Sequence, residues 1–219
     1  MKRLALIILT LFCTQIIFSQ TEVKNGVVID HTAEKIVKNT VAKLKNDTPF
    51  SFSFSYNLSF SDKTTEKGSG TFLSNNDKYK IETTNFSDYC NGTTYWHYVK
   101  ANEEVEISDI EEGNSMFNFT KIINQFSNSY GAKLIRYEVF NKVNCAIIDL
   151  TPTKKSAVSK IRLYTSKTNN TVSKIIIYTY EGTTYTYTFT NYKSKIQTQP
   201  TDFTFPKSKY PKAKTVDLR

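Results

Sequence analysis

The chain has 219 residues, of which 39% are hydrophobic and 22% charged, with a formal net charge of +9. This is enough for one domain with a core of its own. A basic excess of this size fits anionic membrane surfaces, acidic partners or simply a lysine-rich soluble surface. Nucleic acid is not expected as a partner, because the chain contains no compact basic motif.

The first twenty residues have the layout of a secretory signal peptide. Lys2 and Arg3 precede an apolar run over 4–18, and small or polar residues follow. The run is shorter than the roughly 20 residues of a spanning helix and contains polar residues, which argues against a membrane anchor. Phe12 precedes Cys13 where lipoprotein processing requires a small residue, so we do not expect lipidation there. We therefore predict cleavage near residue 20.

The remaining residues, 21–219, form the predicted exported domain, and no second apolar span follows. Loss of Lys2 and Arg3 leaves 27 basic and 20 acidic side chains, a net charge of +7. Two cysteines remain, Cys90 and Cys145, which can pair in an oxidising compartment. Because both lie in predicted strands with no evident partner, we expect two buried free thiols.

An amphipathic helix is predicted from His31 to Asn46, ahead of Pro49. Its apolar stripe consists of Ile36, Val37, Val41 and Leu44. This spacing is helical, and lysines occupy the other faces.

The next segment alternates aromatic or apolar residues with mostly serine. The alternating positions are Phe50, Phe52, Phe54, Tyr56, Leu58 and Phe60. Successive side chains of a strand point to opposite faces, so this strand has one aromatic face and one polar face. The aromatic face has to be covered by protein or by a ligand.

After this strand the chain consists almost entirely of short β-prone runs separated by turn residues. The predicted strands are 67–74, 78–84, 86–90, 94–99, 104–110, 133–140, 143–150, 159–165, 172–180 and 184–192. Asn91-Gly92 and Glu181-Gly182 are typical hairpin turns between them. About eleven antiparallel strands in one domain indicate a strongly curved sheet or a barrel.

One helix interrupts this meander, at about 114–130. Its apolar residues are Met116, Phe119, Ile122, Ile123 and Phe126. The spacing is helical, with Ser115 as a plausible N-cap and Gly131 as a stop. Such a helix either plugs a packed core or covers a cavity.

Sequence motifs for catalysis or metal binding are weak. The two histidines, His31 and His97, have no accompanying ligand pattern, and the seven glycines form no phosphate loop. No Gly-x-Ser-x-Gly elbow occurs. We therefore expect no enzyme activity, no metal site and no cofactor.

Several local motifs together resemble the LolA family of periplasmic lipoprotein carriers, in the style of its Bacteroidetes branch. The motifs are 67–72 (Lys-Gly-Ser-Gly-Thr-Phe), 77–82 (Asp-Lys-Tyr-Lys-Ile-Glu), 91–98 (Asn-Gly-Thr-Thr-Tyr-Trp-His-Tyr), 203–206 (Phe-Thr-Phe-Pro) and 216–219 (Val-Asp-Leu-Arg). Their order and spacing cover nearly the whole of 21–219. The hairpin at 91–98 combined with the terminal motif is the most specific part.

The resemblance implies a mainly β fold, an unclosed barrel of about eleven strands with an N-terminal helix and a helical lid. It implies a periplasmic, non-enzymatic carrier that shelters lipoprotein acyl chains between the inner and outer membranes. Its partners would be acylated lipoproteins, an inner-membrane ABC transporter and an outer-membrane acceptor, and we expect a monomer. From the alternation we predict a cavity lined by Phe52, Phe54, Tyr56, Phe72, Tyr79, Ile81, Trp96 and Tyr98. The lid would contribute Met116, Phe119, Ile122, Ile123 and Phe126.

The sequence departs from the family at one point. Better-studied members have an arginine before a proline in the second hairpin, and this arginine latches the lid. Here the equivalent turn is 74–77, Ser-Asn-Asn-Asp. The alternatives to lipoprotein transport are a lipid-sensing or lipid-binding regulatory module and a carrier of another acyl cargo.

Overall fold

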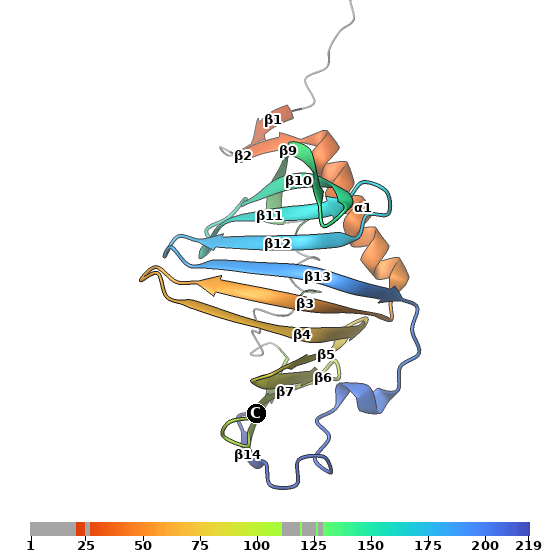
Figure 1. Ribbon diagram of the computed structural model, residues 1–219, viewed down its shortest axis with the longest axis vertical. Coiled ribbons are helices and arrows are strands. Elements are labelled where there is room, and N and C mark those ends of the chain that lie inside the picture. The colour runs from red at the N-terminus through yellow and green to blue at the C-terminus, as the bar shows by residue number, and fades with distance from the viewer. Residues whose placement is uncertain (1–20, 25–26, 111–118, 120–125, 127–128) are drawn as a thin grey trace, which may run out of the picture.

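The computed structural model describes residues 21–24, 27–110, 119, 126 and 129–219. These residues are mainly β. They form one large curved sheet, a separate two-stranded hairpin and one long helix (Figure 1). Within the described part of the chain, no helix is long and apolar enough to span a membrane.

The elements follow one another in a simple order. The hairpin β1 (Thr21–Lys24) and β2 (Val27–Asp30) leads into α1 (His31–Asp47). The next six strands are β3 (Phe50–Ser59), β4 (Thr65–Asn75), β5 (Lys78–Thr83), β6 (Phe86–Cys90), β7 (Thr94–Val99) and β8 (Glu104–Asp109). Five more are β9 (Tyr130–Phe140), β10 (Val143–Pro152), β11 (Val158–Ser166), β12 (Val172–Thr179) and β13 (Thr184–Ser194). The 3₁₀ turn η1 (Pro200–Phe203) and β14 (Lys214–Asp217) complete the chain.

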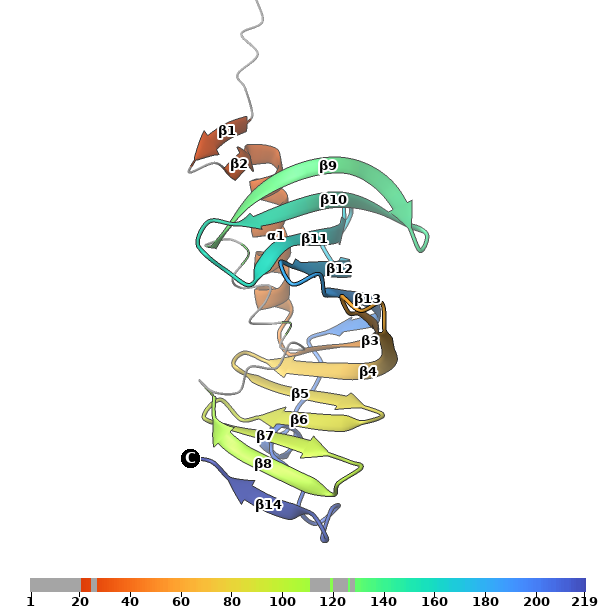
Figure 2. The same ribbon diagram turned by 90° about the vertical axis from the view of Figure 1, so that its left-hand side faces the viewer.

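The strand order of the large sheet is β14-β8-β7-β6-β5-β4-β3-β13-β12-β11-β10-β9. Its neighbours pair antiparallel, except that β14 pairs parallel with β8. Strands β14 and β9 form the two edges, so the sheet curves without closing into a barrel (Figure 2). The unclosed sheet agrees with the expectation, but it has twelve described strands rather than about eleven, because β14 adds to the edge at β8.

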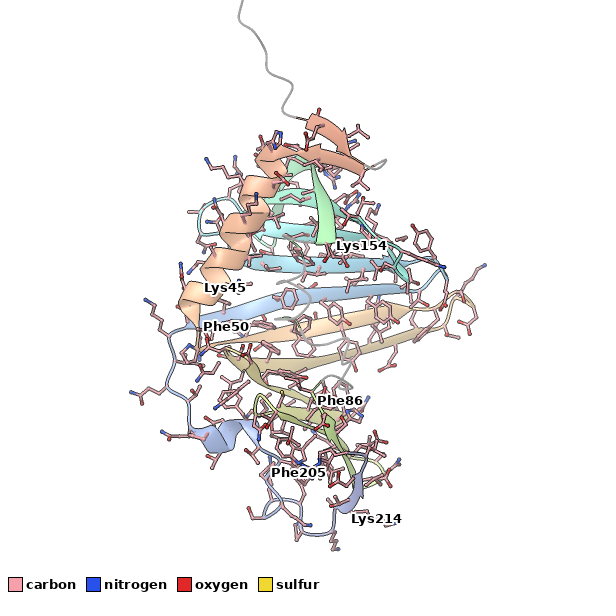
Figure 3. The ribbon with its side chains drawn as sticks, turned by 180° about the vertical axis from the view of Figure 1, so that it is seen from behind. Lys45, Phe50, Phe86, Lys154, Phe205 and Lys214 are labelled. Atoms are coloured by element: carbon pink, nitrogen blue, oxygen red, sulfur yellow. The ribbon has the colours of Figure 1, made fainter. Side chains whose placement is uncertain are left out.

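The helix α1 begins and ends with contacts to the sheet. Asp30 caps it by accepting hydrogen bonds from the backbone N–H groups of Thr32 and Ala33, and its second carboxylate oxygen accepts from Leu134 N in β9. At the other end Asp47 is buried and accepts from the Tyr192 hydroxyl at 2.7 Å. These contacts hold α1 across one face of the sheet, here called the inner face (Figure 3).

The two faces of the sheet have different apolar clusters. The inner face carries the main core, to which α1 contributes Ala33, Val37, Val41 and Leu44. The outer face has two smaller clusters, one around Tyr89 and Phe205 near β14 and one around Cys145 and Tyr164 on β9–β12. The outer cluster near β14 is covered by the segment between η1 and β14, which reaches it with Phe205 and Ala213.

Candidate functional site

The aromatic strand is the centre of the inner face. Its alternating residues Phe50, Phe52, Phe54, Tyr56 and Leu58 are all buried, as the sequence predicts. Serines lie between them on the outer face, with the exception of Asn57. The strand ends at Ser59, and the next residue, Phe60, is 37% exposed. Strand β3 therefore contributes a continuous wall of rings.

Neighbouring strands extend this aromatic wall. Phe72 of β4 stacks on Phe52 at 4.9 Å between ring centroids, and Tyr79 of β5 stacks on Phe72 at 6.3 Å. On the other side, Phe189 of β13 meets Phe52 edge-on at 4.9 Å. Six of the eight predicted cavity residues share this face: Phe52, Phe54, Tyr56, Phe72, Tyr79 and Ile81.

The other two predicted cavity residues lie elsewhere. Trp96 and Tyr98 belong to the outer cluster, where Tyr98 packs against Phe205 and Tyr210 at 5.3 and 4.4 Å. The prediction that they share the inner face is wrong. In β7 the inner positions are Tyr95 and His97, because Tyr95 pairs with Cys90 of the inner cluster.

Two glycines of β4 make room for the wall. Gly68 pairs with Tyr56 and Gly70 with Phe54 across the two strands. A Cβ atom added at Gly68 would lie 2.4 Å from the Tyr56 hydroxyl oxygen, and one at Gly70 would lie 2.8 Å from Phe54 Cζ. The rings of Phe54 and Tyr56 therefore lie directly over the β4 backbone, which only glycine permits at these positions.

A single ring from outside the sheet fills the middle of the wall. Phe119 has helical backbone and is 1% exposed. It makes edge contacts with rings of three strands at centroid distances of 5.0–5.5 Å, and these rings are Phe52, Phe54, Phe72, Tyr187 and Phe189. Edge-to-face geometry is the favourable arrangement for such pairs. Phe119 occupies the place in which an apolar ligand would contact the most aromatic surface.

A second predicted lid residue is also described. Phe126 is 1% exposed and meets Tyr130 edge-on at 6.0 Å. The remaining lid residues of the prediction, Met116, Ile122 and Ile123, lie outside the described residues. Phe119 and Phe126 thus face inward as predicted, while the movement of a lid stays a prediction.

The contact between α1 and the wall is nearly complete. A cavity of ≈ 10 Å³ lies between them, lined by Leu44, Phe52, Val172, Phe189 and Tyr192. This is room for about one water-sized group. Protein side chains therefore already fill this part of the inner face.

One polar pair interrupts the inner face near β6 and β7. His97 Nδ1 lies 2.6 Å from Oδ1 of the buried Asp88, directly across the two strands. The hydrogen bond to Asp88 raises the pKa of His97, and the negative charges of Asp88 and of Glu106 on β8 act in the same direction, against desolvation. The pair is therefore a titratable group within the inner face, where the His97 ring lies beside the rings of Phe86 and Tyr95.

The two cysteines of residues 21–219 lie in the sheet as free thiols. Cys90 and Cys145 are buried and unpaired, and they lie on opposite faces of the sheet, which confirms the expected free thiols. Burial raises the pKa of both thiols. Among the described residues, no three His, Cys, Asp or Glu side chains gather as a metal ion would require.

Comparison with known proteins gives similarity in fold alone. No family model and no curated protein sequence matches this chain. An uncharacterized conserved protein from Thermus thermophilus has a TM-score of 0.59 and 11% identity, covering 85% of this chain and 99% of its own. This chain shares that fold.

Two other solved structures are similar at lower TM-scores. The LolA superfamily protein NE2245 from Nitrosomonas europaea has a TM-score of 0.43 and 13% identity, over 78% of this chain and 97% of that chain. Lipoprotein LppX from Mycobacterium tuberculosis has a TM-score of 0.48 and 12% identity, over 78% and 100%. Both TM-scores are below 0.5, so neither similarity indicates a function.

Proposed function

We propose that this protein is a non-enzymatic periplasmic carrier that shelters the acyl chains of lipoproteins on the inner face of its sheet. It would receive its cargo from an inner-membrane ABC transporter and pass it, as a monomer, to an outer-membrane acceptor. The observation that carries this proposal is the aromatic wall of β3, β4 and β13, whose centre is in contact with the ring of Phe119.

The physical need for such a shelter is large. Each methylene group transferred from a membrane to water costs about 0.8 kcal/mol, so a chain of about a dozen carbons costs roughly 10 kcal/mol. A lipidated protein needs an apolar surface to cross an aqueous space. The wall offers such a surface, with rings contributed by neighbouring strands rather than by a mobile loop.

The segment that carries Phe119 and Phe126 would act as the lid. Apolar contacts have no fixed direction, so the contacts of these rings with the wall can be exchanged for contacts with an acyl chain. The latch arginine of the family is absent from the turn at 74–77. Closure would therefore depend on ring packing rather than on a directed hydrogen bond.

Two experiments test this proposal. First, depletion of the protein in its native host should leave lipoproteins at the inner membrane, as measured by membrane fractionation. Normal sorting would contradict transport and favour a lipid-sensing module. Second, purified residues 21–219 should bind an acylated lipoprotein but not its unacylated form. Phe54→Glu should abolish that binding because it places a charge in the wall, whereas Ser55→Glu, on the outer face of the same strand, should leave it intact.

A further inference from the structure

The positive charge of the protein is concentrated at one end of the sheet. Residues 130–179, which comprise β9 to β12 and their turns, contain nine Lys and Arg but only two Asp and Glu. Residues 21–219 as a whole contain 27 basic and 20 acidic side chains. The remainder therefore has 18 of each, and β9–β12 carries the entire net charge of +7.

The two acidic side chains of these four strands already form ion pairs within the protein. Asp149 accepts two hydrogen bonds from Arg162, at 2.7 and 2.9 Å, and Glu138 accepts one from Arg136 at 2.6 Å. Six lysines form no ion pair with a described residue: Lys133, Lys142, Lys154, Lys155, Lys167 and Lys174. Their charge is available to an external anion.

Aromatic rings are interleaved with these cations. Lys167 Nζ lies 4.1 Å from the centroid of the Tyr137 ring, and Lys174 Nζ lies 5.1 Å from that of Phe140. Tyr137 and Phe140 belong to the same strand, β9, but lie on opposite faces of it, because Tyr137 pairs with Ala146 of the inner cluster and Phe140 packs against the outer cluster. Lysine stems over aromatic rings, with the ammonium groups in water, are typical of surfaces that meet the lipid headgroup region.

The turn of the β9–β10 hairpin forms the tip of this basic and aromatic surface. Its two turn residues, Asn141 and Lys142, have φ values of 47° and 66°, as a tight hairpin turn of the primed type requires. Just before the turn, Val139 is 72% exposed, and Tyr137 is 45% exposed. Figure 2 shows the tip projecting beyond the ends of β11 and β12.

We propose that the tip of the β9–β10 hairpin is a docking site for the surface of an anionic lipid bilayer. Val139 and Tyr137 would rest at the boundary between headgroups and acyl chains. Lys142 and Lys167, from two turns at the same rim of the sheet, would contact lipid phosphates. This site lies apart from the aromatic wall, and the inference does not depend on the proposed function.

The test is co-sedimentation of residues 21–219 with vesicles. Vesicles of phosphatidylethanolamine containing phosphatidylglycerol should bind the protein, and vesicles of phosphatidylcholine alone should not. Binding should be lost at about 1 M salt, where the Debye length is about 3 Å. A basic residue near an anionic surface strengthens binding about fivefold, so Lys142→Glu/Lys167→Glu should weaken it at least about 25-fold.

Two matched variants serve as controls. Lys207→Glu/Lys212→Glu makes the same change in net charge on exposed residues between η1 and β14, and it should bind as the unmodified protein does. Val139→Ser should weaken binding about tenfold, because it removes an apolar side chain that would be buried in the lipid. Val23→Ser, a residue 70% exposed on β1, should have no effect.

Several outcomes would overturn the proposal. Equal weakening by the two double variants would mean that net charge alone attracts the protein. Absence of binding of the folded protein to the phosphatidylglycerol vesicles would also overturn it. Capture of an acidic protein through the same lysines would then assign the surface to a protein partner. No lipoprotein is present in this test, so its failure and that of the carrier proposal are separate results.

Discussion

In the proposed function, Phe119 contributes the ring that an acyl chain would displace. Full burial of a phenylalanine stabilises by about 1.5–3 kcal/mol. An acyl chain of about a dozen carbons gains roughly 10 kcal/mol on transfer out of water. Because the second quantity is several times larger, the proposed acyl ligand would gain more free energy than displacement of the Phe119 ring from the wall would cost.

Phe119→Ala should therefore strengthen acyl binding. Without the ring, the ligand no longer has to displace it, and the affinity for a fluorescent fatty acid should rise about 10- to 100-fold. The same substitution should lower the free energy of unfolding by about 3–5 kcal/mol, because it leaves a cavity. Fluorescence titration and urea denaturation measure the two effects.

The matched control is Phe205→Ala. Phe205 is also a buried phenylalanine, but it packs in the outer cluster against Tyr89 and Tyr98. Its loss should destabilise the protein without changing the affinity for the fatty acid. If Phe119→Ala left the affinity unchanged or lowered it, the ring would be part of a fixed core rather than a competitor of the ligand.

Gly70 allows a test of how closely the Phe54 ring packs on the β4 backbone. An added Cβ would lie 2.5 Å from the backbone oxygen of Glu82 and 2.8 Å from the Phe54 ring. Gly70→Ala should therefore destabilise the protein by about 1–3 kcal/mol and weaken acyl binding by displacing Phe54. Ser69→Ala, at the neighbouring exposed position, is the control, and equal urea midpoints for the two variants would contradict the close packing.

At the level of elements, the buried face of β3 can be predicted from its sequence, whereas that of β7 cannot. Strict alternation of rings with serine in β3 leaves only one possible buried face. In β7 the residues 95–98 are Tyr-Trp-His-Tyr, so both faces are rich in rings. The segment from Phe205 to Ala213 covers the outer face, and nothing local to β7 predicts that cover. The assignment of Trp96 and Tyr98 to the cavity fails for this reason.

The pairing of β6 with β7 gives the inner face a dependence on pH. The folded protein raises the pKa of His97 above its ordinary value of about 6.5, chiefly through the hydrogen bond with Asp88. The charged pair therefore stabilises the fold fully below that ordinary value. This stabilisation is lost as the pH rises through the raised pKa of His97.

His97→Gln should consequently destabilise the protein most in mildly acidic solution. Below pH of about 6.5 the loss should reach about 1.5 kcal/mol, as for a hydrogen bond with a charged partner, and it should shrink as the pH rises. Urea midpoints across this range measure the difference. His31→Gln, whose side chain is 57% exposed, is the control. A loss for His97→Gln that is constant with pH would contradict the charged pair.

At the scale of the whole molecule, the sequence predicts the kind of sheet better than its edges. Turn residues and β-prone runs indicate a long meander, and its strands between β3 and β13 occur as predicted within a few residues. The β1–β2 hairpin and β14 are missed, because each is only four residues long and depends on pairing with a partner strand. Short edge strands of this kind have little local pattern of their own.

The open sheet carries the aromatic wall on β3, β4 and β13 and the projecting β9–β10 hairpin at one edge. The inner face holds the aromatic wall and the ring of Phe119, while the projecting β9–β10 hairpin, at the basic end of the sheet, is the proposed docking site for anionic membranes. A carrier needs both a shelter for its cargo and a way to approach the membranes that supply and accept it. In the proposed function, the aromatic wall is this shelter for acyl chains.

The most direct test of this claim is site-specific photo-cross-linking in living cells. A photoreactive phenylalanine would replace Phe189 on the inner face or Trp96 on the outer face; both residues are only partly buried. After irradiation, the Phe189 variant should form an adduct with acylated lipoprotein, and the Trp96 variant should not. Equal adducts from both positions, or none from Phe189 in a folded and exported protein, would contradict the claim that acyl chains bind on the aromatic wall.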